Sequence, residues 1–328
     1  MMNKRILGNG LEVSTIGLGC MGMSEFYGPQ DDQAAMAVLH KAAELGCTML
    51  DTADTYGNFH NEELIGDFLK QTDVEIKIAT KCGIVRRPGE YERRIDNSPE
   101  YIRSACESSL RRLGVDCIDL YYIHRLDPKA LIETTMETLA QLVAEGKIAH
   151  IGLSEVSAAT LKQAHSVFPV STVQTEYSLW TRDVEAEILP TCQELGIGFV
   201  PYSPLGRGFL TGRFNDKSLF ENGDFRNGLP RFTSENLKAN STLSDFIIQM
   251  AEQKSCSPAQ ISLAWLLAQG DNIVPIPGTN KVKHLEDNFG AADIHLTPED
   301  LSQFKHAIDR FQPAGSRYSV EGMKGINA

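Results

Sequence analysis

The stretch LGVDCIDLYYIH, residues 113–124, contains the unit that decides the fold. A helix is expected to end at Leu113-Gly114, because glycine readily takes the left-handed conformation that closes a helix. The apolar run 118–123 has the length of a buried strand, and His124 follows it directly. The same alternation of apolar run and amphipathic helix recurs along the chain, so the fold follows from its repetition.

Eight short apolar runs are predicted to be strands. They occupy residues 16–19, 48–50, 76–79, 118–123, 148–153, 171–173, 198–200 and 273–276. Helices between them have cap-and-proline starts at Ser98-Pro99, Ser257-Pro258 and Thr297-Pro298, and several end on glycine. Strands that alternate with helices form parallel sheets, and eight such units without a linker favour closure. The predicted fold class is α/β: a single (β/α)8 TIM barrel domain over residues 1–328.

Two segments lie outside this alternation. Apolar residues flank Gly8-Asn9-Gly10, which predicts an N-terminal β-hairpin over residues 5–13. After the seventh strand, residues 205–234 are rich in Gly, Asn, Phe and Arg and have no clear period. Long loops in compact domains are usually functional, so we expect this one to lie near a ligand.

The segment Gly17–Gly22 matches the dinucleotide-binding pattern G-x-G-x-x-G. That motif works only where a helix begins at the glycines and directs its N-terminus at a pyrophosphate. Gly28-Pro29 follows instead, and the first good helix is expected only over residues 32–45. We therefore interpret the motif as a glycine-rich barrel strand rather than as the start of a Rossmann fold.

Composition excludes several classes of protein. The chain has 328 residues, a net charge of −12 and 42% hydrophobic residues, without an apolar run long enough to span a membrane. The negative charge argues against nucleic acid as a partner. Seven scattered cysteines without a C-x-x-C pair predict reduced packing residues rather than disulfides or zinc ligands. No signal peptide is recognisable after Met1, so a cytoplasmic protein is expected; the sequence carries no signal for an oligomeric state.

Polar residues follow three of the predicted strands. Asp51 and Tyr56 come after the second, Lys81 after the third and His124 after the fourth. Barrel active sites form at these strand ends, so we expect the four side chains to meet. One histidine after a strand is more often structural, but four polar groups at one rim favour catalysis. Lys81, held by Asp51, would lower the pKa of Tyr56, and His124 would orient a carbonyl oxygen for hydride addition.

The later strand ends are typical of a cofactor site. Ser154, Glu155 and Gln174 offer polar groups for a carboxamide, and Tyr202 offers a ring face for stacking. The segment 206–208 could wrap a pyrophosphate, and 277–281 places backbone N–H groups and a cation at a helix start, which suits phosphate.

These residues together resemble the aldo-keto reductase family. The matching segments, in chain order, are 46–57, 113–120, His124, 152–154, Gln174, 202–206 and 275–279 leading to Asn288. They cover nearly the whole chain, and the pattern is most similar to the auxin-induced-like and perakine-reductase-like branch. The resemblance implies a catalytic tetrad of Asp51, Tyr56, Lys81 and His124, with NADPH (or NADH) stacked on Tyr202 and a small-molecule carbonyl substrate.

The remaining site predictions combine the strand ends with this resemblance. Expected cofactor contacts are Cys20, Met21, Asp51, Ser154, Glu155, Gln174, Tyr202, Ser203, Leu205, Gly206, Arg207, Gly278, Thr279, Lys281, His284, Asp287 and Asn288. Expected substrate contacts are Tyr27, Tyr56, His124, Arg125 and Trp180.

Three positions depart from the common family pattern. Glu155 stands where an asparagine usually pairs with Ser154, Gly278-Thr279 replaces a Lys-Ser pair, and His284 replaces an arginine that often holds the 2′-phosphate. A carboxylate cannot donate to the carboxamide oxygen. Lys281 and Lys283 could compensate at the phosphate.

Two functions of different class follow from the resemblance. The first is an NAD(P)H-dependent reductase of aldehydes or ketones. The second is a cofactor-binding regulatory subunit similar to potassium-channel β-subunits, which can retain the tetrad. The sequence has no long inactivation-like N-terminal segment, which favours the enzyme. A metal-dependent barrel hydrolase is a third, more remote hypothesis.

Overall fold

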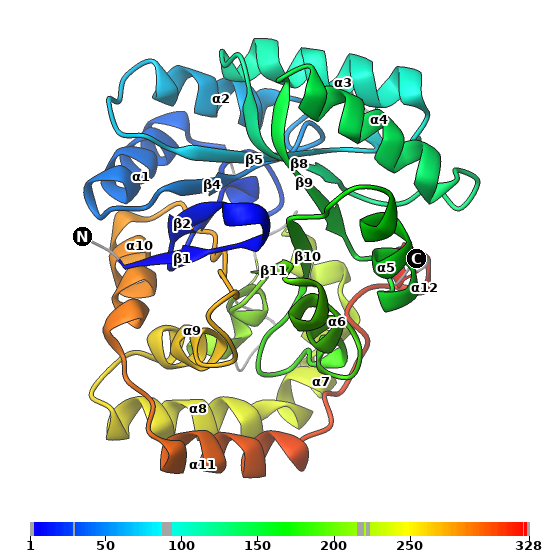
Figure 1. The fold of residues 1–328 in the computed structure, drawn as a ribbon. Coiled ribbons are helices and arrows are strands. Elements are labelled where there is room, and N and C mark those ends of the chain that lie inside the picture. Colours follow the sequence, from blue (N-terminus) through cyan, green and yellow to red (C-terminus); the bar gives the residue numbers. More distant parts are fainter. Residues whose placement is uncertain are drawn as a thin grey trace.

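The computed structural model describes residues 3–28, 30–86, 94–214, 220, 224–323 and 325–326. Seven parallel strands form the wall of the predicted barrel (Figure 1). Their order in the sheet is β11-β10-β9-β8-β5-β4-β3, so sequence neighbours are spatial neighbours. The strands are β3 (Leu18–Gly19), β4 (Met49–Asp51), β5 (Lys77–Cys82), β8 (Ile118–Ile123), β9 (Ile148–Ser154), β10 (Thr172–Glu176) and β11 (Gly198–Tyr202).

The eighth predicted strand closes the barrel without forming a regular ladder. Residues 273–278 lie between β11 and β3 through parallel bridges from Ile273 to Phe199 and from Gly278 to Gly19. Pro275 and Pro277 have no N–H to donate, and their carbonyl oxygens accept from the N–H groups of Gly17 and Gly19. The close approach explains Gly19, where a Cβ would lie 2.8 Å from the Ile276 carbonyl oxygen. The glycine motif thus belongs to barrel closure, as expected.

Helices surround this wall and begin at the expected caps. Ser98, Ser257 and Thr297 each accept a hydrogen bond from a backbone N–H of the first turn that they cap. Gly114 and Gly196 end helices with φ near 70° and 66°. The helices are α1 (Asp32–Glu44), α2 (His60–Leu69), α3 (Pro99–Leu113), α4 (Ile132–Ala144), α5 (Ala158–Val167), α6 (Ile188–Leu195), α8 (Ser241–Gln253), α9 (Pro258–Leu267), α10 (Val282–Phe289) and α11 (Pro298–Asp309). Helices α8 and α11 pack together beyond this ring (Figure 1).

The predicted hairpin closes the amino-terminal end of the barrel. Strands β1 (Lys4–Ile6) and β2 (Glu12–Ser14) pair antiparallel. Leu7, Leu11 and Val13 are buried against inward-facing residues of β4, β5, β8 and β11. Because this plug fills one end, a ligand must enter at the other end, where the strands finish.

The segment predicted as an irregular loop is more structured than expected. Its described part contains short 3₁₀ helices at Gly206–Thr211, Phe225–Gly228 and Pro230–Phe232, followed by α7 (Ser234–Ala239). The Phe225 N–H donates to the Phe26 carbonyl, which ties the segment to the loop after β3. Successive 3₁₀ turns have no long period, so sequence periodicity could not reveal them.

Three short elements complete the carboxyl-terminal rim. Strands β6 (Ile84–Val85) and β7 (Arg94–Ile95) pair after β5, and α12 (Val320–Met323) lies in the tail. Within the ranges that the structure describes, no helix has both the length and the apolar character needed to cross a membrane.

Candidate active site

The four residues predicted to be catalytic meet at the carboxyl ends of three strands. Asp51 ends β4, Lys81 lies on β5, His124 directly follows β8 and Tyr56 occupies the turn after β4. Lys81 Nζ lies 2.5 Å from Asp51 Oδ1 and 3.5 Å from Tyr56 Oη. The Tyr56 and His124 rings meet edge to face, with centroids 5.8 Å apart. All four side chains are more than nine-tenths buried, so a substrate oxygen here would be shielded from water.

Lys81 and Asp51 form a buried ion pair. Lys81 also donates to the Thr52 carbonyl, and Asp51 Oδ2 accepts from Gln174 Nε2 at 2.7 Å. Burial lowers the pKa of Lys81 and raises that of Asp51, while their mutual attraction opposes both shifts. The extra hydrogen bonds matter because buried charges stay ionised only when their remaining polar atoms are satisfied. The pair therefore places a cation beside the phenol.

The pKa of Tyr56 differs from the sequence prediction. We expected Lys81 to lower it, but burial raises the pKa of Tyr56 well above its usual range, and Asp51 raises it further. Arg125 opposes this shift. The prediction was wrong because a sequence does not reveal how completely a phenol is buried, and burial disfavours the charged form. Tyr56 is consequently protonated at neutral pH, as a proton donor must be.

Unusual backbone conformations gather at neighbouring strand ends. Glu155 after β9 and Ser203 and Arg207 after β11 have φ values of 55°, 47° and 54°, although none is glycine. At Gly206, also with positive φ, a Cβ would lie 2.7 Å from Trp180 Nε1. Such strain persists where a functional constraint maintains it. It coincides with the strand ends predicted to hold the nicotinamide.

The predicted carboxamide residues do lie at one rim, but with partners that the sequence did not suggest. Ser154 Oγ accepts from Arg125 Nη1 at 3.2 Å. The Tyr202 hydroxyl lies 3.0 Å from the Tyr318 hydroxyl, in the C-terminal tail. The Gln174 side-chain amide donates an N–H to Asp51. The amide oxygen of Gln174 takes no part in this bond and can accept from a ligand.

Glu155 belongs to a buried charge cluster that sequence analysis missed. We define the Glu176 cluster as Glu155, Glu176, Arg207, Arg231 and Arg317. Arg317 Nη1 lies 3.5 Å from Glu155 Oε1, which also accepts from the Glu176 N–H. Glu155 Oε2 and Arg317 Nε and Nη1 are buried without a hydrogen-bond partner. The two Arg317 nitrogens still lie in ion pairs, with Glu155 and, at 3.9 Å, with Asp183. Buried polar atoms are normally satisfied, so the remaining acceptor, Glu155 Oε2, fits the N–H of an amide-bearing ligand such as nicotinamide.

The phosphate end of the predicted cofactor site contains a cation that we did not predict. His284 Nε2 lies 2.8 Å from Arg213 Nη2. Burial and Arg213 lower the pKa of His284, so His284 is neutral at pH 7. Arg213 is exposed, as is Lys281, and both can meet an anion. Arg213 escaped prediction because it lies in the 205–234 segment, which has no period.

Other predicted contacts at this end have structural partners. The Asp287 carboxylate accepts from the Ser257 hydroxyl, and Asn288 is buried on α10. Cys20 and Met21 follow β3, with the Cys20 N–H donating to the Asp51 carbonyl. They therefore lie at the same rim as the tetrad. Gly278 ends the barrel-closing segment and Thr279 follows it, shortly before the start of α10.

Two side chains predicted to contact cofactor or substrate, Arg207 and Trp180, pack against other protein groups. The Arg207 guanidinium pairs with Glu176 at 2.7 Å and is 3% exposed, so only its backbone can approach a pyrophosphate. Trp180 stacks on Phe209 with centroids 4.4 Å apart and is 2% exposed, so little of its side chain is open to a substrate. Tyr27 remains half-buried near Arg226.

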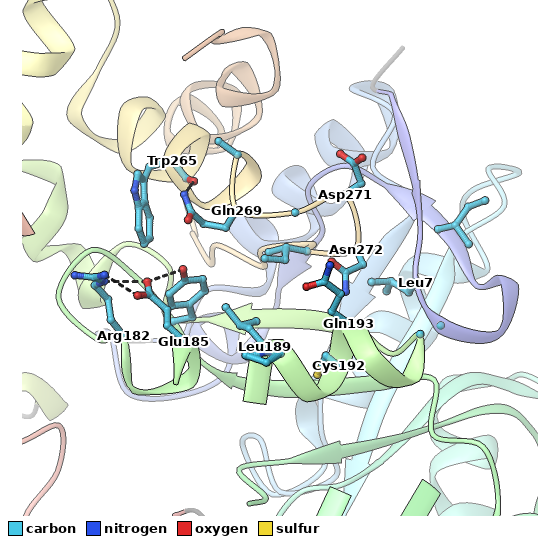
Figure 2. Close-up of a pocket in the computed structure, with 18 of the residues that line it drawn as sticks. Leu7, Arg182, Glu185, Leu189, Cys192, Gln193, Trp265, Gln269, Asp271 and Asn272 are labelled. Carbon is cyan, nitrogen blue, oxygen red and sulfur yellow. Dashed lines mark hydrogen bonds and ion pairs between the residues drawn. The ribbon is translucent and has the colours of Figure 1, made fainter. Parts of the chain in front are cut away.

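A cavity of about 1030 Å³ lies away from the tetrad. Figure 2 shows it between α6 and α9, beside Leu7 of the hairpin plug and the Arg182–Glu185 ion pair. None of the tetrad residues lines it. Across the described ranges, no group of three His, Cys, Asp or Glu side chains is arranged to hold a metal ion, and none of the seven cysteines is in a disulfide.

Comparisons with known proteins agree with this geometry. Residues 15–309 match the sequence model of the Aldo/keto reductase family. A soybean (Glycine max) protein named probable aldo-keto reductase 1 is 48% identical over 314 residues, which are 94% of this chain and 89% of that protein. A glycerol dehydrogenase from Gluconobacter oxydans superposes with a TM-score of 0.86 at 29% identity, covering 95% of this chain and 97% of its own.

A second solved structure extends the comparison. An aldo/keto reductase from Klebsiella pneumoniae in complex with NADP and acetate has a TM-score of 0.74 and 26% identity, covering 97% of this chain and all of its own. The family match covers most of the chain, and the relatives reported are named reductases or dehydrogenases. The chain therefore belongs to the aldo/keto reductase family and is an oxidoreductase that acts on carbonyl and alcohol groups.

Proposed function

We propose that the protein reduces an aldehyde or ketone to an alcohol with NADPH, and that Tyr56 donates the proton. The main support for this proposal is the contact between a buried, protonated Tyr56 and Lys81, which Asp51 holds in place. When bound, reduced nicotinamide supplies a hydride to the carbonyl carbon. The carbonyl oxygen gains negative charge as this happens, and Tyr56 transfers its hydroxyl proton to it.

The remaining tetrad residues prepare this proton transfer. Lys81 stabilises the phenolate that Tyr56 leaves behind, because a buried cation acts strongly on a nearby developing anion. Asp51 and the Thr52 carbonyl fix the position of Lys81. His124 faces the Tyr56 ring and is placed to orient the same substrate oxygen. These roles need no metal ligand.

The rim after β9, β10 and β11 is the proposed cofactor site. Ser154, Glu155 and Gln174 would hold the carboxamide, and the half-buried Tyr202 would stack on the ring. Glu155 Oε2, which is buried without a hydrogen-bond partner, supports this assignment. The segment 277–281 and the start of α10 would hold the phosphate groups. The solved relative named with NADP supports the choice of cofactor.

We further propose that residues 1–328 act as one barrel domain in the cytoplasm. The seven cysteines support a reducing compartment, because none of them is in a disulfide. The regulatory-subunit alternative gains no support from the relatives reported, which are named as enzymes.

The direct test of this function is loss of reduced-nicotinamide absorbance when the protein meets NADPH and a reactive aromatic aldehyde. We expect turnover, with the matching alcohol as product. The protein boiled before mixing is the control for uncatalysed loss. Tight NADPH binding without any alcohol formed would instead favour a cofactor-sensing partner protein.

A separate prediction concerns the choice between NADPH and NADH. Arg213→Ala is expected to weaken NADPH binding about tenfold or more and to spare NADH, because a hydrogen bond to a charged phosphate contributes about 1.5–3 kcal/mol. Titration of nicotinamide fluorescence measures both affinities. Lys305→Ala, a charge loss on the outer helix α11, is the control. Equal weakening of both cofactors would show that Arg213 does not contact the 2′-phosphate.

A further inference from the structure

Most charged side chains around Tyr56 are paired. Lys81 pairs with Asp51, Arg86 pairs with Glu25 at 2.7 Å, and Arg317 lies 3.5 Å from Glu155. Each of these three cations therefore has a carboxylate partner close by.

Arg125 differs from these residues. It directly follows His124 and is half-buried, yet no carboxylate whose side chain the structure describes lies within ion-pair distance of it. Its bonds go to neutral acceptors: Nη1 donates to the His124 carbonyl at 2.7 Å and to Ser154 Oγ at 3.2 Å. Nε and Nη2 are engaged by neither of these bonds. The guanidinium is therefore anchored, charged and able to donate further.

The tail limits the space around Arg125. A Cβ on Gly325 would lie 3.5 Å from Arg125 Cδ and 3.8 Å from Nε, so the tail backbone lies against the stem of this side chain. Burial lowers the pKa of Arg125, but Tyr202, Glu155 and Tyr56 nearby raise it, and the guanidinium stays charged although Glu155 lies beyond ion-pair distance. Arg125 thus belongs to the space between the tetrad and the tail, where the part of a substrate beyond its carbonyl would lie.

A half-buried cation in this position needs an acceptor. Desolvation of an unmatched charge is costly, and a guanidinium presents its donors in a fork that matches a carboxylate. The protein as a whole is acidic, with a net charge of −12, so the positive charge of Arg125 is a local feature of the barrel rim. It would attract and orient an anion there without raising the affinity of the whole surface for anions.

We propose that Arg125 binds a carboxylate on the substrate, so that the preferred substrates are carbonyl compounds that carry an acid group. This inference rests on the proposed reductase function. The carboxylate itself does not react: it receives hydrogen bonds from Nε or Nη2 while the carbonyl oxygen lies against Tyr56 and His124. Arg125 is in this respect a specificity-determining residue, and its anchor on Ser154 holds the guanidinium in register with the cofactor site.

The test compares the 2-, 3- and 4-formylbenzoates with their methyl esters. We expect at least one acid to exceed its ester in kcat/KM about ten- to hundredfold, as a hydrogen bond to a charged group allows. Arg125→Gln keeps an N–H donor toward the His124 carbonyl but removes the charge, and should abolish the preference. Arg125→Lys should restore part of it. General damage to catalysis lowers acid and ester alike, so the ratio isolates the carboxylate contact.

Binding supplies a readout that does not depend on turnover. Benzoate should quench tryptophan fluorescence of the full chain with NADP⁺, and Arg125→Gln should weaken this binding about tenfold or more. Arg111→Gln, an equal charge change on α3, should not. Equal kcat/KM for acids and esters, or benzoate binding indifferent to Arg125→Gln, overturns the inference. Arg125-dependent benzoate binding without any turnover would overturn the reductase and retain the carboxylate site.

Discussion

Replacing Tyr56 with phenylalanine is expected to lower kcat for carbonyl reduction by about 10²–10⁴-fold, the usual contribution of a positioned general acid. The change removes one oxygen and keeps the ring, whose edge-to-face contact with His124 needs no hydroxyl. Burial keeps the wild-type phenol protonated, so the mutation removes the proton donor. Single-turnover loss of NADPH absorbance with a neutral aldehyde measures the effect.

Cofactor affinity separates this effect from a loss of structure. NADPH fluorescence titration should give nearly the same affinity for Tyr56→Phe and wild type, because the proposed cofactor contacts come from other strand ends. Tyr177→Phe is the matched control: it removes a hydroxyl bonded to Glu185, next to the cavity between α6 and α9. Turnover that survives in Tyr56→Phe would assign proton transfer to another group.

Much of this arrangement could be predicted because it depends on local order. Apolar runs between capped helices mark seven strands, and residues at the carboxyl ends of β4, β5 and β8 must share one rim of a parallel barrel. The eighth strand was harder to predict. The apolar run 273–276 predicts a regular strand, yet Pro275 lacks an N–H and the segment closes the barrel through isolated bridges.

The sequence was least informative about contacts between residues distant along the chain. The Arg207 guanidinium pairs with Glu176 on β10, a partner that the glycines flanking Arg207 did not indicate. Tyr318 and Arg317 reach the rim from a tail without periodicity. The direction of the Tyr56 pKa shift was also missed, since it depends on complete burial. Local pattern gives the positions of side chains along strands; it does not give their partners or their solvation.

The Glu176 cluster yields the second large effect. Glu176→Gln is expected to lower the free energy of unfolding by about 3–5 kcal/mol, because it leaves Arg207 and Arg231 in a buried site without the carboxylate they pair with. Burial opposes ionisation of Glu176, yet the arginines of the cluster together hold its pKa below the usual range, so the carboxylate is charged in the folded protein. Urea denaturation measures the change as a shift in midpoint at constant slope.

Comparison with an exposed pair identifies burial as the cause. Glu12 pairs with Lys4 at 2.6 Å on the hairpin, but both side chains are more than half exposed, so Glu12→Gln should cost less than about 1 kcal/mol. Adding Arg207→Met to Glu176→Gln should recover stability, because it removes one uncompensated cation. Methionine fills much of the space of the arginine side chain with apolar atoms. A double variant that loses the sum of both single costs would show that the two residues stabilise the rim independently.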